Sequence, residues 1–97
     1  MPKGYIIARV TVTDPEAYAA YVAGATEAIR KYRGRPLIRG GAHEALEGEA
    51  RPRNVVIEFD SMEQARSYYH SPEYQDAKAR RAGACEGEFV LVEGADS

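Results

Sequence analysis

Three charged side chains are placed where acid/base or anion-binding chemistry is feasible. Arg9 interrupts an apolar run, Glu58 stands between an isoleucine and a phenylalanine, and Arg39 precedes two glycines. A guanidinium changes the proton affinity of a carboxylate beside it, and an arginine can bind a ligand carboxylate through two parallel hydrogen bonds. We therefore take Arg9, Arg39 and Glu58 as candidate catalytic residues.

Each of these candidates also has a purely structural explanation. Arg9 and Glu58 could form a partly buried ion pair between neighbouring strands, and such a pair would need no ligand. A bent strand explains the two glycines after Arg39 equally well, because a bulge costs little where no Cβ is present. The sequence leaves both explanations open.

Aromatic and imidazole side chains form a second group of candidates. Tyr69 and Tyr74 flank a predicted kink, where their hydroxyls could orient a small aromatic or carbonyl ligand, although amphipathic helix packing predicts the same residues. His70 could act as a general base near neutral pH, or lie exposed at the kink. Together with Tyr5 from the first strand, these are the candidate ligand-binding residues.

Metal and cofactor motifs do not occur in the sequence. The two histidines, His43 and His70, lack the close spacing of a metal-binding motif. The paired glycines lack the spacing of a phosphate-binding loop. We therefore expect no metal and no organic cofactor.

Strand and helix signals alternate along the first part of the chain. Residues 5–12 alternate between apolar and mixed positions, as a half-buried strand does. An Asp-Pro-Glu start signal at position 14 opens a helix, and Gly34 supplies the left-handed residue that ends it. Residues 35 to about 46 predict a second strand broken at the glycine pair, residues 53–59 predict a third, and a hairpin loop joins them.

The second half repeats the helix-then-strand pattern with an interruption. Ser61 begins a helix with the spacing of a capping box, and the Ser-Pro-Glu signal at Ser71 begins another. The second crossover is therefore predicted to be two helical pieces meeting at a kink near His70. Gly83 closes the second piece, and residues 88–93 form the last strand.

The order βαββαβ predicts an α+β sandwich. Its two crossovers put both helical segments on one face of a four-stranded antiparallel sheet and leave the other face open. The open face is too apolar for water alone, so we expect a homodimer through it. Its expected members are Tyr5, Ile7, Arg9, Thr11, Val56 and Glu58.

Length and charge exclude several classes of protein. A chain of 97 residues fits a single domain over residues 1–97, and its net charge of -2 suits no polyanion, so no nucleic-acid partner is expected. Arg9 cuts the first apolar run short of a signal peptide or a membrane span. A single Cys85 allows no internal disulfide. We expect a soluble, cytoplasmic protein with no membrane partner.

Four segments of the chain are distinctive: Thr13-Asp14-Pro15-Glu16-Ala17-Tyr18, Arg39-Gly40-Gly41, Val56-Ile57-Glu58-Phe59, and Tyr69 followed by Ser71-Pro72-Glu73-Tyr74. These segments resemble one bacterial family, the family called domain of unknown function 1330, and the similarity runs nearly from end to end. The resemblance implies a ferredoxin-like fold that assembles as a dimeric α/β barrel. Other branches of that superfamily include cofactor-free monooxygenases, lactone isomerases and haem-dependent enzymes, whereas this family has no established activity to carry over.

Two hypotheses of function follow. The first is a cofactor-free enzyme of oxygenase or isomerase type, acting on a small organic molecule bound between the sheet and the kinked helix. Its pocket would be lined by Arg9, Arg39, Glu58 and Tyr69. The second is a non-catalytic dimeric ligand-binding or interaction module, in which Arg9 and Glu58 fix the dimer register.

Overall fold

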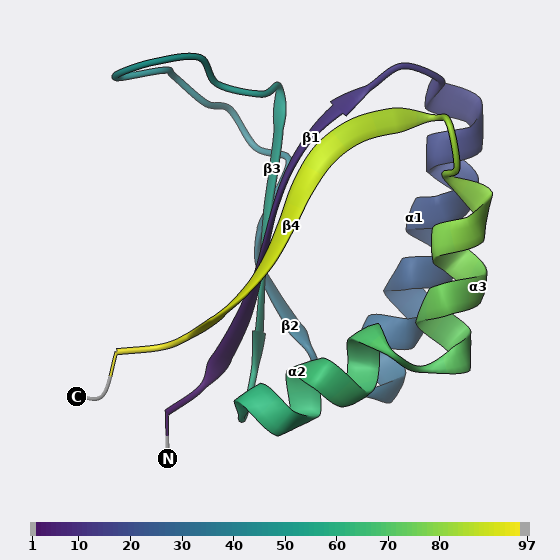
Figure 1. The fold of residues 1–97 in the computed structure, drawn as a ribbon, viewed down its shortest axis with the longest axis vertical. Helices are drawn as coiled ribbons and strands as arrows, with labels where there is room; N and C mark the ends of the chain where they lie inside the picture. Colours follow the sequence, from purple (N-terminus) through teal and green to yellow (C-terminus); the bar gives the residue numbers. More distant parts are fainter. Residues whose placement is uncertain (1, 96–97) are drawn as a thin grey trace.

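A four-stranded antiparallel sheet carries three helices on one of its faces, as Figure 1 shows in the computed structural model. The structure describes residues 2–95. The strand order across the sheet is β2-β3-β1-β4, which confirms the predicted βαββαβ sandwich. The elements are β1 (Gly4–Val12), α1 (Pro15–Lys31), β2 (Arg35–Arg39), β3 (Arg53–Phe59), α2 (Met62–Tyr69), α3 (Pro72–Arg80) and β4 (Cys85–Glu93).

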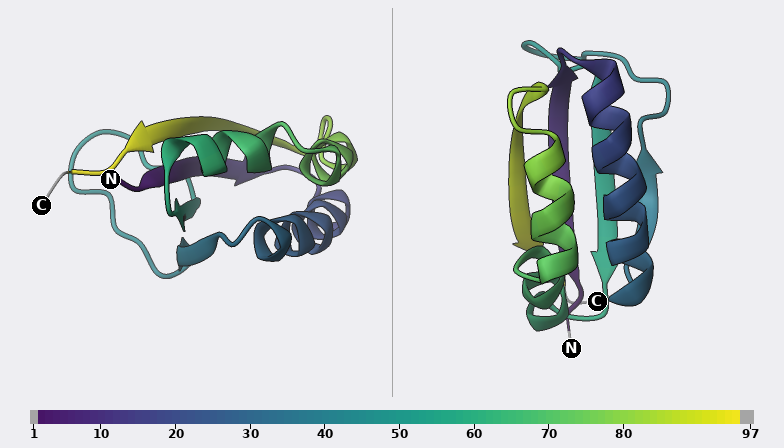
Figure 2. Two further views of the ribbon diagram at one scale, coloured as in Figure 1. Left: turned by 90° about the horizontal axis from the view of Figure 1, so that it is seen from below. Right: turned by 90° about the vertical axis from the view of Figure 1, so that its right-hand side faces the viewer.

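The helices divide the covered face between them. The helices α1 and α3 run side by side across the sheet, and α2 lies at one end of it (Figure 2). Gly24 allows the close approach of α1 and α3, because a Cβ there would lie 2.9 Å from the Cβ of Ala77. None of the helices within residues 2–95 is long and apolar enough to cross a membrane.

The end of α1 differs from its prediction in one residue. The left-handed residue is Arg33, with φ 63°, and not Gly34. The Gly34 N–H then donates to the Ile29 carbonyl at 2.8 Å, which closes a Schellman motif. Glycine is required at position 34 for another reason: a Cβ would lie 2.8 Å from the Phe59 ring.

The kink in the second crossover is confirmed, and Ser71 builds it. The helix α2 ends at Tyr69 and α3 begins at Pro72. The buried Ser71 hydroxyl accepts the Tyr74 N–H at 3.1 Å and donates to the Tyr68 carbonyl at 2.7 Å. One side chain therefore caps α3 and binds the end of α2.

The extent of the second strand was predicted wrongly. The strand β2 ends at Arg39, and residues 40–52 form an exposed loop that contains no strand. The irregularity in its register lies between Pro36 and Ile38, not at the glycines. Gly40 instead turns the chain with φ 70°. The last strand, β4, also starts earlier than the expected position 88, at Cys85.

Side chains alternate between the two faces of the sheet as predicted. The covered face holds the buried core residues Ile6, Ala8, Val10, Ile57 and Phe59. The open face holds the opposite parity, because residues directly opposite in neighbouring strands share a face. Opposite Ile7 lie Val56 and Val90, and opposite Tyr5 lie Glu58 and Val92.

Candidate ligand-binding site

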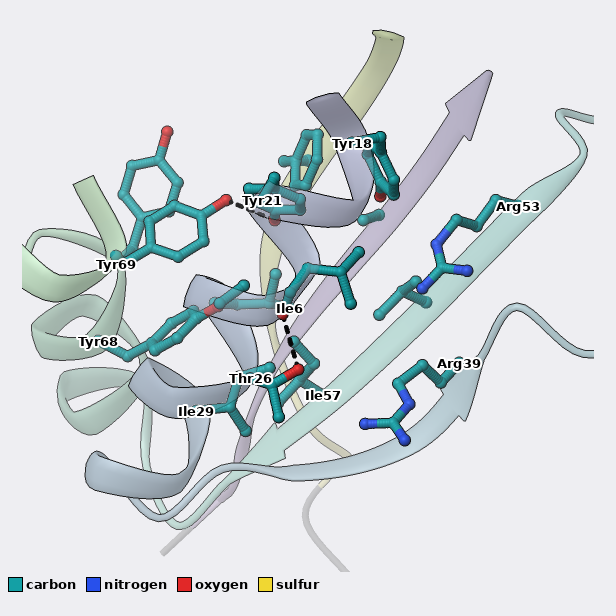
Figure 3. Close-up of a pocket in the computed structure, with 16 residues that line it drawn as sticks. Ile6, Tyr18, Tyr21, Thr26, Ile29, Arg39, Arg53, Ile57, Tyr68 and Tyr69 are labelled. Carbon is teal, nitrogen blue, oxygen red and sulfur yellow. Dashed lines mark hydrogen bonds between the residues drawn. The ribbon is translucent and has the colours of Figure 1, made fainter. Parts of the chain in front are cut away.

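A hollow of about 50 Å³ lies between the sheet and the helices (Figure 3). We call it the inner cavity. Most of its lining is apolar or phenolic, from the strands below and from all three helices above. The main lining residues are Ile6, Tyr18, Tyr21, Thr26, Ile29, Arg39, Arg53, Ile57, Tyr68, Tyr69 and Tyr74.

A second, larger hollow adjoins the inner cavity between α2 and β4. Its volume is about 360 Å³, and we call it the outer hollow. Ile6, Tyr69 and Phe89 line both spaces, so these side chains form the wall between them. Arg66 and His70 line the outer hollow but not the inner cavity. A drug-sized ligand needs at least about 300 Å³, a volume that the outer hollow reaches and the inner cavity alone does not.

Two arginines reach the edge of the inner cavity from neighbouring strands. Arg39 lies opposite Val55, and Arg53 lies two positions before it, so both side chains share the covered face. Their guanidinium groups point the same way, toward the cavity (Figure 3). Within residues 2–95 neither arginine takes part in a salt bridge.

Arg53 is held in place by the turn after β2. Its guanidinium carbon lies 5.6 Å from the centre of the Tyr18 ring. A Cβ on Gly40 would lie 2.6 Å from its Nη1 atom, so only glycine leaves room for it there. Its Nε atom is buried and has no hydrogen-bond partner among the described residues. The Arg53 donor is thus positioned but unsatisfied.

Two tyrosines and an arginine form a hydrogen-bonded chain at another side of the inner cavity. The Tyr21 and Tyr74 hydroxyl oxygens are 3.0 Å apart, and Arg81 Nη2 donates to Tyr74 at 3.4 Å. The Arg81 guanidinium is also fixed by the rings of Tyr21 and Phe89, at 5.0 and 4.3 Å. Burial, and then the neighbouring Tyr74, raise the pKa of Tyr21 far above its ordinary value, so Tyr21 stays a neutral phenol.

The candidate residues separate onto the two faces of the sheet. Arg39, Tyr69 and Tyr74 line the inner cavity, and His70 lines the outer hollow. Arg9 lies on the open face with Glu58 and Tyr5, because alternate residues of a strand point to opposite faces. The single pocket expected from Arg9, Arg39, Glu58 and Tyr69 therefore does not form.

Glu58 pairs with residues other than Arg9. Its carboxylate accepts Arg35 Nε at 2.8 Å and the Tyr5 hydroxyl at 2.9 Å, and Lys3 lies 3.8 Å away. The hydrogen bond from Arg35, then that from Tyr5, lowers the pKa of Glu58. A carboxylate with a lowered pKa is a poor general base at neutral pH. These contacts indicate a structural ion pair.

Arg9 has no contact with Glu58 because the register separates them. Arg9 lies opposite Asn54 on β3 and Glu88 on β4. Its Nη2 atom donates to the Glu49 carbonyl at 3.2 Å, which fastens the loop 40–52 beside the open face. The predicted pairing of Arg9 with Glu58 is wrong, since adjacent strands alone do not fix the register.

The residues that sequence reasoning missed are Arg53, Tyr21 and Arg81. Arg53 shares the parity of Val55 and Ile57, which would have indicated a charge on the covered face. Tyr21 lies on the predicted apolar side of α1, and nothing separated it from an ordinary core residue. Arg81 follows the end of α3, where a cation is unremarkable in sequence.

Solved structures of similar fold include proteins of known and unknown activity. A protein of unknown function from Rhodopseudomonas palustris has a TM-score of 0.81 at 17% identity, covering 99% of this chain and 85% of that one. SnoaB, a cofactor-independent oxygenase from Streptomyces nogalater, has a TM-score of 0.64 at 13% identity, covering 100% and 97%. A dimeric ferredoxin-like protein of unknown function from Thermobifida fusca has a TM-score of 0.56 at 19% identity, covering 95% and 91%.

These similarities establish the ferredoxin-like fold and leave the chemistry to be argued from the site. No protein of curated function shows significant sequence similarity to the chain. A family model does match, and it spans residues 3–95, which include every strand and helix and both hollows. The chain therefore belongs to the family described as domain of unknown function DUF1330.

Proposed function

We propose that the protein is an enzyme that converts a small organic molecule without a metal or organic cofactor, by a reaction of oxygenase or isomerase type. The observation that carries this proposal is the inner cavity, an apolar and phenolic hollow with two unpaired arginines at its edge among the described residues. Small-molecule sites combine an apolar hollow with a few directed polar groups in this way. The similarity in fold to SnoaB, a cofactor-independent oxygenase, supports the type of reaction.

Both reaction types can begin with the same step. A base removes a proton from a carbon beside a carbonyl, and the electron pair moves onto the carbonyl oxygen to give an enolate. In an isomerase the proton returns to a different carbon. In an oxygenase the enolate reduces O₂, so that a CH₂ group becomes a carbonyl, with one oxygen atom retained and the other released as water.

The residues of the two hollows suit these roles. An imidazole accepts a proton near neutral pH, and His70 is the one imidazole that lines either hollow within the described chain. The hydrogen-bonded phenols Tyr21 and Tyr74 line the inner cavity, where an O–H group can stabilise the enolate oxygen. We assign His70 the role of general base and the phenol pair, through its one free O–H, that of the oxyanion donor.

Tyr69 is the proposed gate between the two hollows. It is half-buried, it lines both spaces, and its hydroxyl makes no hydrogen bond within residues 2–95. Rotation of its side chain would therefore join the inner cavity to the outer hollow without breaking a side-chain hydrogen bond. The joined space would reach the volume that a small organic ligand needs.

Exchange of α-protons with deuterium tests the proposal, because it detects the enolate that both reactions share. In D₂O, NMR would follow a panel of aryl ketones, 1,3-diketones and keto acids with and without the protein. We expect faster exchange for at least one compound. The rate should fall to the uncatalysed value in Ala25→Leu, which fills the inner cavity, and persist in Ala23→Leu on the exposed side of α1. Exchange that is unaccelerated for the whole panel, or equally fast in Ala25→Leu, would contradict the proposal.

A homodimer through the open sheet face is the proposed assembly. Large apolar side chains on this face are well exposed: Ile38 at 49%, Val90 at 49% and Val92 at 41%. Exposed apolar patches of this kind mark interfaces, and a two-fold dimer is the commonest way to cover one. The similar proteins from Thermobifida fusca and Bacteroides fragilis are both described as dimeric.

A non-catalytic dimeric ligand-binding module is the second candidate function. The observation that favours it is the pairing of Glu58, a candidate catalytic residue, with Arg35 and Tyr5, because a carboxylate held in this way is a poor general base. Under this alternative, a ligand would bind in the joined hollows with no acceleration of α-proton exchange. The exchange experiment above separates the two candidates.

A further inference from the structure

The two arginines of the inner cavity differ from Arg35 at the start of β2 and from Arg51 in the loop 40–52. Arg35 pairs with Glu58 and Asp60, and Arg51 pairs with Glu88, all within 2.9 Å. Arg39 and Arg53 have no carboxylate partner within the described part of the chain. Among residues 2–95, no acidic side chain lines the inner cavity either. Two guanidinium groups without a counter-ion beside an apolar hollow form a receptor for an anion.

The turn after β2 favours a ligand over an accidental arrangement. Arg53 would be free to move into solvent if nothing held it, yet its Nε atom is buried and lacks a partner within residues 2–95. The left-handed Gly40 provides the space that its guanidinium fills. A buried donor without an acceptor is unfavourable unless another group satisfies it. A ligand carboxylate satisfies it and matches the planar guanidinium.

The hydrogen-bonded chain of Tyr21, Tyr74 and Arg81 provides a second donor to a ligand. Arginine can only donate, so Tyr74 accepts from Arg81. If Tyr74 donates to Tyr21, the Tyr21 proton has no acceptor among the described residues, and if Tyr21 donates, the Tyr74 proton has none. Either direction leaves one phenolic O–H free, and both phenols line the inner cavity. Tyr21 lies across the cavity from Arg39 and Arg53 in Figure 3.

We propose that the ligand of this site is a small planar organic acid whose carboxylate binds Arg39 and Arg53 and whose far carbonyl or hydroxyl oxygen accepts the free phenolic proton of Tyr21 or Tyr74. The inference rests on the proposed function for its location in the inner cavity and adds the chemical class of the molecule. The flat shape follows from the lining, to which α1, α2 and α3 each contribute tyrosine rings. Arg81 acts through Tyr74 as a positioning residue.

The test uses three probes that differ by one group each. These are 4-hydroxybenzoate, 4-hydroxybenzamide without the negative charge, and benzoate without the far oxygen. Binding would be measured by NMR titration, with the methyl signals of the cavity residues Ile6 and Ile57 as reporters. We expect 4-hydroxybenzoate to bind about tenfold more tightly than the amide, and about fivefold more tightly than benzoate, as charged and neutral hydrogen bonds require.

Matched variants assign each preference to its residues. Arg53→Gln or Arg39→Gln should abolish the preference for the acid over the amide. The double variant Tyr21→Phe/Tyr74→Phe should abolish the preference over benzoate. Arg30→Gln removes a charge from the exposed last turn of α1 and should change neither. Because Arg39 is exposed, its variant keeps the test valid even if Arg53→Gln fails to fold.

The outcomes separate this inference from the proposed function. If the amide binds in the cavity as tightly as the acid, the inference is wrong while the cavity site stands. If the acid preference survives in both arginine variants, the inference is also wrong. If no probe shifts the Ile6 and Ile57 methyl signals, the cavity site fails, and the inference fails with it.

Discussion

Gly40 serves two purposes at the scale of a single residue. Its φ of 70° turns the chain out of β2, and its N–H donates to the Asn54 carbonyl at 2.9 Å. Its missing Cβ also leaves the space that Arg53 fills. A side chain there would strain the backbone and displace the arginine together.

Gly40→Ala is expected to lower the free energy of unfolding by about 1–2 kcal/mol, the cost of a left-handed conformation in a residue with a Cβ. It should also weaken anion binding, because Arg53 must move. Gly41→Ala is the matched control, since a Cβ at position 41 meets nothing within 4 Å and its φ is not positive. Urea denaturation measures the free energy of unfolding of both variants. An equal decrease in Gly40→Ala and Gly41→Ala would contradict the special role of Gly40.

The helices and strands show how far sequence patterns determine this molecule. Capping signals at Asp14, Ser61 and Ser71 begin helices at the predicted positions, because a cap depends on neighbouring residues alone. The length of β2 was not predictable, since the exposed loop 40–52 contains apolar residues such as Leu46, 86% exposed, that resemble a strand continuation.

Contacts between elements that are distant in the sequence could not be predicted from the sequence either. Tyr69 was expected to face inward from α2, but Tyr68 is the buried neighbour, at 2% exposed, and Tyr69 is half-buried between the two hollows. The two residues are consecutive in α2, and the packing of the helix against the sheet decides which of them is buried. Three of the residues proposed from the sequence, Arg39, Tyr69 and Tyr74, line the inner cavity, whereas Arg53 could be placed there only with the register of β3.

The joint between α2 and α3 depends on one hydroxyl, so Ser71→Ala tests this element directly. It removes the cap of α3 and the hydroxyl donor to the Tyr68 carbonyl, which keeps only the Ser71 backbone N–H at 3.2 Å. We expect a loss of about 1–2 kcal/mol in the free energy of unfolding. Ser67→Ala on the exposed side of α2 should have no measurable effect by the same denaturation method. A Ser71→Ala protein as stable as the parent would refute this account of the kink.

At the scale of the whole molecule, the two faces of the sheet have different roles. The covered face contains the core, the inner cavity and its arginines, whereas the open face contains exposed valines between ion pairs. The loop 40–52 projects on the open side, away from the helices (Figure 1). A second copy against this face would lie on the side of the sheet opposite the inner cavity, and Val90 would belong both to the interface and to the lining of the outer hollow.

Val90→Lys should convert the proposed dimer into a monomer. Val90 lies on the open face of the edge strand β4, and a lysine there would be buried in the interface without a counter-charge. Sedimentation equilibrium should give one chain mass for Val90→Lys and two for the parent. Ala19→Lys on the exposed side of α1 serves as the control and should stay dimeric. A parent protein that sediments as a monomer would rule out the open-face dimer.

The central claim is that the space between the sheet and the helices is a ligand site. The most direct measurement is a crystal structure of the protein soaked with 4-hydroxybenzoate. We predict density for the ring in the joined hollows, with its carboxylate at Arg39 and Arg53 and its hydroxyl at Tyr21 or Tyr74. Tyr69 should be rotated to admit it. An inner cavity that stays closed at saturating concentration, with the probe bound elsewhere or absent, would contradict the account.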